Sequence, residues 1–253
     1  MSSPKTGEPA RLAQNWPIIA EMPKQRALQT THSPHLPESR PGQAGGKRDQ
    51  NRRERTRGLL AASLGLFLER GLDGTTIDDI TREAKVAKGS FYRYFQSKED
   101  LISALFAPAG ARVAAAFTRA EARLGKVGRP GEVERAYLRL GRELLLAVMA
   151  EPDVTRLYLQ ESRSPGDSAR RPIQELERLI AKAALRVSEL ALSHGLLRET
   201  HPEVSTLAVI GAAERLLQAY FSGQLSVEPG EAIRDLVAIV MNGLRRPDRQ
   251  TQR

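Results

Sequence analysis

Residues 75–101 read TTIDDITREAKVAKGSFYRYFQSKEDL, and this stretch decides the fold. Thr76 can cap a first short helix together with the acidic residue three positions later, as in a capping box. After a short connector, a second helix is predicted over residues 88–95, where Phe91 and Phe95 lie four residues apart and point inward together. Two short helices joined by so few residues predict a helix-turn-helix.

The outward face of the second helix carries groups that suit a nucleic acid. At about 100° per residue, Gly89 and Arg93 lie roughly opposite the two phenylalanines, and Ser90 also points outward. Because Gly89 has no side chain, a sugar–phosphate strand could approach the backbone closely. A single narrow helix with this face fits the major groove of DNA.

The segment from about residue 55 to residue 105 resembles the DNA-binding domain of the tetracycline-repressor (TetR) family of bacterial transcriptional regulators. The resemblance covers about a fifth of the chain. The residues that carry it are Phe67, Gly71, Thr75, Thr76, Ile77, Ile80, Ala84, Val86, Lys88, Gly89, Ser90, Phe91, Tyr92, Phe95, Ser97, Lys98, Glu99 and Leu101.

The resemblance implies a set of DNA contacts. Phosphate contacts are expected from Thr76, Tyr92, Tyr94 and Lys98. Contacts to base edges, or mixed contacts, are expected from Lys88, Gly89, Ser90 and Arg93. The basic start of the first long helix, with Arg52, Arg53 and Arg55, is interpreted either as an extra attachment to the backbone or minor groove or as a solvated helix end.

Two residues depart from the family pattern in the turn between the short helices. Lys85 stands where the family usually has glycine, and Ala87 replaces a small hydroxyl cap. A non-glycine residue at positive φ costs about 1–2 kcal/mol, and a lost cap about 1 kcal/mol. The turn is therefore expected to be less rigid than usual, unless Lys85 gains a phosphate contact.

The rest of the chain predicts an all-α fold, because extended alternating patterns are missing. Prolines mark the starts of several helices. Helices are expected over about 49–70, 97–106, 109–124, 131–150, 153–162, 172–194, 202–222 and 229–244, with a break at Pro108. The expected domains are a disordered tail (1–46), a helix-turn-helix domain (47–106), a helical effector-binding and dimerisation domain (107–246) and a second disordered tail (247–253).

The last two helices carry apolar surface wider than one stripe, which favours burial both within the subunit and against a partner. The family resemblance implies a homodimer built on these helices, and a purely intramolecular core is the alternative. The residues expected at the interface are Val204, Leu207, Gly211, Leu217, Phe221, Ile233, Leu236, Val237, Val240 and Leu244.

The region of residues 109–194 is expected to hold a pocket for a small-molecule effector of unknown identity. Its candidate lining residues are Phe106, Phe117, Tyr137, Met149 and Tyr158, for which core packing is the alternative. The nearby Arg156, Glu161 and Arg163 are interpreted as a charged surface.

Composition narrows the classes of protein. The formal charge of +9 favours polyanionic partners such as nucleic acid. Cysteine is absent, which excludes thiolate chemistry and suits a reducing cytoplasm. No apolar run was found that approaches a membrane span, and the N-terminus does not resemble a secretory signal. No histidine lies among carboxylates at metal-ligand spacing, and no catalytic motif is present, so neither a metal, a cofactor nor an enzyme is expected.

The sequence thus predicts a sequence-specific DNA-binding regulator in the bacterial cytoplasm, associated with the nucleoid. By family analogy it would be a repressor that a small molecule releases from a palindromic operator. Two alternatives remain. A protein of this fold that binds a ligand or partner and no longer reads DNA is favoured by Lys85 and Ala87, and a sequence-nonspecific nucleoid-type binder is favoured by the high pI alone.

Overall fold

A computed structural model describes residues 46–164, 168–195 and 201–244 of the chain. All of them belong to one compact unit. The predicted tails, apart from Gly46, lie outside the described residues. Within the described ranges every regular element is a helix, so the all-α prediction is confirmed.

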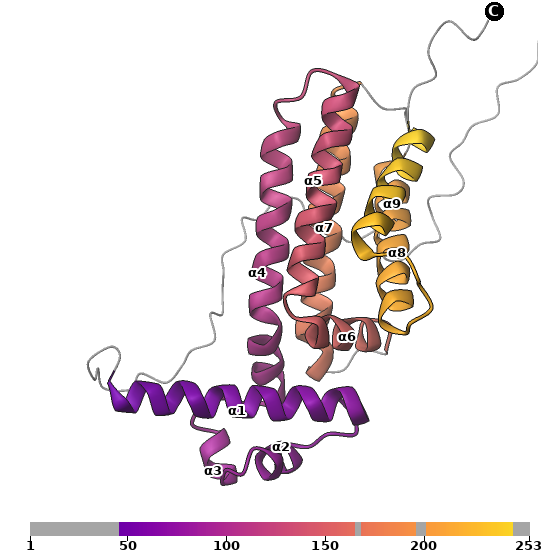
Figure 1. The fold of residues 1–253 in the computed structure, drawn as a ribbon. Coiled ribbons are helices and arrows are strands. Elements are labelled where there is room, and N and C mark those ends of the chain that lie inside the picture. The colour runs from indigo at the N-terminus through magenta and orange to yellow at the C-terminus, as the bar shows by residue number, and fades with distance from the viewer. Residues whose placement is uncertain (1–45, 165–167, 196–200, 245–253) are drawn as a thin grey trace, which may run out of the picture. The chain divides into compact units, whose positions relative to one another are not determined.

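The helices follow one another with short connections. They are α1 (Lys47–Arg70), α2 (Ile77–Glu83), α3 (Lys88–Phe91), α4 (Lys98–Leu124), α5 (Pro130–Met149), α6 (Pro152–Glu161), the 3₁₀ turn η1 (Ser168–Arg170), α7 (Arg171–Ser193), α8 (Pro202–Phe221) and α9 (Pro229–Leu244) (Figure 1). Proline stands at the first or second position of α5 to α8, where its missing N–H leaves no hydrogen bond unmade.

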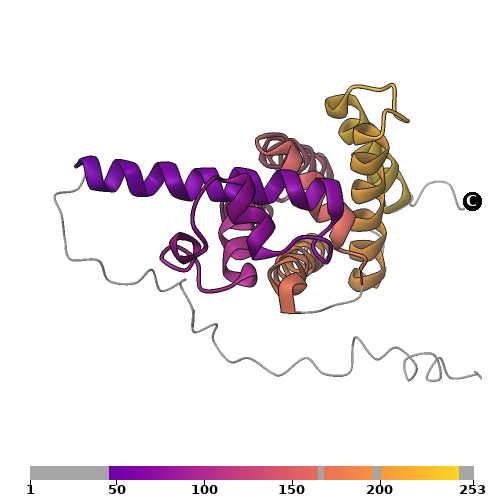
Figure 2. The same cartoon turned by 90° about the horizontal axis from the view of Figure 1, so that it is seen from below.

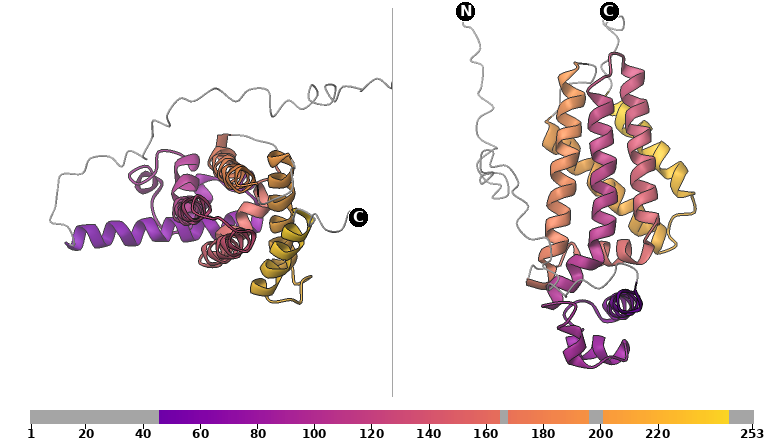
Figure 3. Two further views of the ribbon diagram at one scale, coloured as in Figure 1. Left: turned by 90° about the horizontal axis from the view of Figure 1, so that it is seen from above. Right: turned by 90° about the vertical axis from the view of Figure 1, so that its left-hand side faces the viewer.

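Three long helices form the centre of the bundle. α4 packs on both α5 and α7, and the three run side by side (Figures 1 and 3). α8 packs on α7 and α9 packs on α5, so the last two helices cover one side of this layer. α1, α2 and α3 lie together at one end of the long helices, and the first turns of α1 project beyond them (Figure 2).

The prediction that Pro108 ends a helix is wrong, because α4 runs through this residue to Leu124. Pro108 is exposed, while neighbours such as Phe106 and Val113 are buried in the bundle. An internal proline costs about 3 kcal/mol, and the packing of both halves of α4 against α5 and α7 offsets this cost.

By length and composition alone, α4 is the one described helix that could cross a membrane, and inspection of the sequence did not single it out. Its mean hydropathy is high because alanines accompany the larger apolar residues. Nine of its residues, from Leu101 to Leu124, are buried inside the bundle. Of the apolar 18-residue window in α4, 39% is buried, so packing against α5 and α7 accounts for part of this composition.

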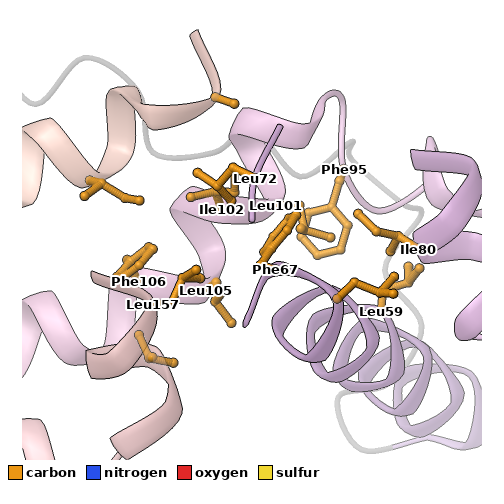
Figure 4. Packing of buried hydrophobic residues seen from close by; sticks show 14 of the residues in the cluster. Leu59, Phe67, Leu72, Ile80, Phe95, Leu101, Ile102, Leu105, Phe106 and Leu157 are labelled. Atoms are coloured by element: carbon orange, nitrogen blue, oxygen red, sulfur yellow. The ribbon is translucent and has the colours of Figure 1, made fainter. Parts of the chain in front are cut away.

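Buried residues form two clusters. The first begins between α1 and α2 with Leu59, Phe67 and Ile80, and continues without a break through Phe106 into α6 with Leu157 (Figure 4). The second lies farther along the bundle, among α4, α5, α7 and α9. The predicted boundary between residues 106 and 107 therefore falls inside a shared core.

Candidate nucleic-acid interface and ligand cavity

Thr76 forms the predicted capping box at the start of α2. The Asp79 N–H donates to the Thr76 hydroxyl (3.2 Å), and the Thr76 N–H donates to the Asp79 carboxylate (3.0 Å). Hydrogen bonds from the Thr76 side chain and backbone lower the pKa of Asp79 below its ordinary value. The box fixes the direction in which α2 begins, and leaves the Thr76 side chain exposed at the surface.

The turn between α2 and α3 shows both departures from the family pattern. Lys85 has a φ of 53°, and it is the one described residue other than glycine with a positive φ. Ala87 occupies the cap position of α3 and makes no side-chain cap hydrogen bond. The turn thus places a non-glycine residue in the left-handed region, at a backbone cost of about 1–2 kcal/mol.

The helix α3 is shorter than predicted, since it ends at Phe91 and not at residue 95. Beyond this point the Tyr94 N–H donates to the Phe91 carbonyl three residues back (2.8 Å), while the Phe95 N–H reaches the same oxygen (2.9 Å). The three-residue hydrogen bond from Tyr94 ends the regular α-helix, and the chain continues to turn in the same sense.

Phe91 and Phe95 anchor this segment as predicted. Phe91 is fully buried and Phe95 is 4% exposed, with their ring centroids 5.7 Å apart. Both belong to the first apolar cluster, together with Leu59, Ile80 and Leu101. The opposite side of the segment is consequently presented to solvent.

That solvent-facing side carries most of the residues expected to contact DNA. Lys88, Gly89, Tyr92 and Arg93 are exposed, and Ser90 is half-buried. A Cβ added at Gly89 would meet nothing within 4 Å, so its backbone can be approached closely. The Lys88 ammonium pairs with Asp78 (2.7 Å), which raises the pKa of Lys88.

Two of the residues expected to contact phosphate interact with other parts of the protein. The Tyr94 side chain is buried. The Lys98 ammonium donates to the Leu72 carbonyl (2.7 Å) and to the Thr75 carbonyl (3.2 Å), and so holds the loop before α2. Contacts of these two residues with phosphate stay a prediction.

The arginines before the helix-turn-helix lie on the first turns of α1, which project past α2 and α3 (Figure 2). Arg53 and Arg55 are exposed and Arg52 is half-buried. Their attachment to DNA remains a prediction.

A partly buried ionic network, not predicted from the sequence, joins α6 and η1 to the loop that precedes α2. Arg170 donates through its terminal nitrogens Nη1 and Nη2 to Asp73 (2.9 and 2.8 Å) and through Nε to Glu161 (3.0 Å). Glu161 also accepts the Leu72 N–H (3.3 Å). We call Asp73, Glu161 and Arg170 the interdomain network. The interpretation of Glu161 as surface was wrong, since it is 4% exposed.

A cavity of about 270 Å³ lies among the helices α4 to α9, and its wall is almost entirely apolar. Phe106, Phe117, Tyr137 and Tyr158 line it, as they could from the sequence, whereas Met149 is not among its lining residues. The wall also includes many residues of α8 and α9. The prediction that residues 109–194 form the pocket is therefore incomplete, because α8 and α9 supply one of its sides.

The residues expected at a dimer interface divide into two groups. Val204 and Leu207 are 65% and 61% exposed, and Gly211 has open space beside its Cα. Phe221 is half-buried, and the side chain of Leu244 lies outside the described residues. The others line the cavity within the same subunit: Leu217, Ile233, Leu236, Val237 and Val240. Ile239, which is 70% exposed, adds to the outward apolar surface.

Among the described residues, no group of three or more His, Asp or Glu side chains is arranged to hold a metal ion.

Part of the chain is similar in sequence to known transcriptional regulators. The family model of bacterial regulatory proteins of the tetR family matches residues 59–105. The HTH-type transcriptional repressor DhaR of Mycobacterium sp. (strain GP1) is 59% identical over 41 residues, which are 16% of this chain and 21% of that protein. The chain spans roughly a fifth of the length of the curated relatives that it matches.

Solved structures resemble a larger part of the chain. The transcriptional regulator FadR from Bacillus subtilis, solved in complex with stearoyl-CoA, has a TM-score of 0.58 and 14% identity, covering 74% of this chain and 98% of that one. The TetR family transcriptional regulator PfmR from Thermus thermophilus has a TM-score of 0.56 and 21% identity, covering 76% and 97%. At these identities the likeness establishes the fold.

Proposed function

We propose that this chain, which carries the DNA-binding domain of the TetR family on the fold of that family, is a sequence-specific transcriptional regulator. It is a cytoplasmic homodimer that represses transcription from a palindromic operator and is released by a small-molecule effector. The observation that carries the proposal is the exposed face of Lys88, Gly89, Tyr92 and Arg93, held outward by the buried Phe91.

The side chains of this face contact different parts of the DNA. The Arg93 guanidinium can bind the O6 and N7 acceptors of a guanine in the major groove, which is worth about 1–3 kcal/mol of discrimination. In the free protein the ion pair with Asp78 holds the Lys88 ammonium close to the exposed face. On binding, Lys88 exchanges this ion pair for a contact with DNA. The Tyr92 ring, 51% exposed, brings its hydroxyl to the phosphate backbone.

The regulator acts as a dimer because one such short segment makes too few contacts for specific binding. The exposed Val204, Leu207 and Ile239 of α8 and α9 supply an apolar surface for a second copy. The two reading segments of the dimer would then contact half-sites in successive major grooves.

The effector acts through α6. Thr155, Tyr158 and Leu159 of this helix line the cavity, while Glu161 at its end belongs to the interdomain network. A ligand that moves α6 therefore strains the link to the loop before α2. The DNA-binding population shifts only by the difference in ligand affinity between the two arrangements.

A titration tests the DNA-binding step. The DNA upstream of the protein's own gene is compared with random DNA of equal length at one salt concentration. We expect the upstream DNA to bind at least a hundredfold more tightly, and Arg93→Ala to lose roughly 5- to 150-fold of this preference. Arg135→Ala, which removes an exposed cation from α5, is the matched control.

Each other outcome of that titration selects an alternative. Equal binding to both DNAs would indicate a nucleoid-type binder, and binding to neither would indicate a protein of this fold that no longer reads DNA.

The dimer is tested by sedimentation velocity. Leu207→Glu places a charge on the proposed interface and is expected to give monomers. Leu146→Glu is the control, because Leu146 of α5 is 60% exposed and Leu207 is 61% exposed. A dimer that survives Leu207→Glu and dissociates with Leu146→Glu would place the interface elsewhere.

A further inference from the structure

The polar groups of the cavity differ in how much hydrogen-bonding capacity they have left. The Thr155 hydroxyl donates to the Val148 carbonyl (2.9 Å), and the Ser205 hydroxyl donates to the Pro202 carbonyl (3.0 Å). The Thr206 hydroxyl donates to Ser188 (3.1 Å). The hydrogens of these three hydroxyls are used within the protein and are not offered to a ligand.

Glu214 of α8 is the sole charged residue among those that line the cavity in the described part of the chain. One carboxylate oxygen accepts the Tyr158 hydroxyl at 2.9 Å. The other lies 3.8 Å from the guanidinium of Arg163, whose side chain is 65% exposed and is not part of the wall. Two carboxylate oxygens offer about four acceptor positions, so Glu214 retains capacity for a further donor.

The surroundings of Glu214 favour a positive ligand group over a negative one. Burial and the charge of Glu214 raise the pKa of Tyr158, so its phenol stays protonated and continues to donate. Partial burial and the same charge raise the pKa of Glu177. No lysine or arginine is among the described residues of the wall, and Arg163, which pairs with Glu214, lies outside it. An anionic head group in the cavity would therefore meet the Glu214 carboxylate with no cation beside it in the wall.

We infer that the cavity binds a lipophilic amine, whose apolar body fills the space and whose ammonium group donates to the Glu214 carboxylate. The apolar wall contributes affinity through burial, and the ammonium restores to Glu214 the charge-assisted hydrogen bonds that water would otherwise supply. The inference rests on the proposed function in taking this cavity as the effector site. The inferred ligand differs from stearoyl-CoA, with which FadR from Bacillus subtilis was solved.

Three probes with the same ten-carbon chain isolate the head group: decylammonium, 1-decanol and decanoate. Each is titrated calorimetrically into the full-length protein, below its micellar concentration and without DNA. We expect decylammonium to bind at least tenfold more tightly than 1-decanol, and decanoate to bind most weakly. Decanoate binding as tightly as decylammonium, or no binding of any probe, overturns the inference.

Variants test the role of the carboxylate. Glu214→Gln keeps the shape of the side chain and is expected to abolish the preference for decylammonium over 1-decanol. Glu203→Gln makes the same change at an exposed position of α8 outside the wall, and should leave the preference intact. A preference that persists in Glu214→Gln refutes the inference, and the wild-type ranking tests it even if this variant does not fold. The DNA titration is independent of this ranking, so the two proposals can fail separately.

Discussion

Replacing Arg170 by methionine is expected to lower stability far more than replacing its partner Asp73 by asparagine. Arg170 has an 8% exposed side chain and Glu161 a 4% exposed one, whereas the Asp73 side chain is 69% exposed. Removing one member of a buried ion pair costs about 3–5 kcal/mol, because the other charge stays buried. An exposed pair contributes about 0–1 kcal/mol.

In the Arg170→Met variant, Glu161 keeps the hydrogen bonds from the Leu72 N–H and from the Gln160 amide, both at 3.3 Å. These neutral donors compensate only part of the lost guanidinium, so we expect a loss near the lower end of the range. For a chain of this size, 3 kcal/mol corresponds to a fall in Tm of roughly 6–12 °C.

Urea denaturation followed by circular dichroism measures both variants and the double variant Arg170→Met/Glu161→Leu. The double variant should recover most of the loss, since apolar residues of similar volume replace buried ion pairs at little cost. If Arg170→Met and Asp73→Asn lose the same free energy of unfolding, within about 1 kcal/mol, the reasoning from burial is refuted.

Three further predictions concern the helix-turn-helix. Phe91→Ala should lower the free energy of unfolding by about 3–5 kcal/mol, because it empties a fully buried position. It should also abolish operator binding. A smaller loss of stability would mean that Phe91 does not anchor the segment. Lys85→Gly removes the strain of a positive φ, so it should stabilise by up to about 1 kcal/mol after the entropy of glycine is deducted, and lower affinity for all DNA sequences if Lys85 contacts phosphate. Thr76→Ala should cost about 1 kcal/mol at pH 7. The hydrogen bonds from Thr76 lower the pKa of Asp79, so the loss of stability in Thr76→Ala is fully present above about pH 4. It should shrink as the pH falls through the pKa of Asp79 in the folded protein. A loss of stability that does not change with pH would contradict this origin.

Local signals in the sequence predicted the parts of the fold that local physics controls. Thr76 was recognisable as a cap because a cap requires only neighbours within three residues. Phe91 and Phe95 were recognisable as anchors from their spacing. The positive φ at Lys85 followed from the family pattern, and the structure confirms it.

Features that depend on distant partners were not predictable in this way. The continuation of α4 through Pro108 depends on packing by α5 and α7, which no local rule contains. Arg170 and Asp73 are 97 positions apart, so no spacing suggests that they meet. The contribution of α8 and α9 to the cavity was hidden for a similar reason, because the same apolar residues suit a partner subunit and an internal wall.

The shared core has a consequence for protein engineering. An exchange of DNA-binding domains between relatives requires a cut in the chain at a domain boundary, which is predicted here between residues 106 and 107. Here the apolar cluster from Leu59 through Phe106 to Leu157 crosses the predicted boundary (Figure 4). The Arg170 guanidinium also pairs with Asp73 in the loop before α2. A chimera that takes α1, α2 and α3 from a relative, without the parts of α4, α6 and η1 that share this core, would join two foreign halves of it.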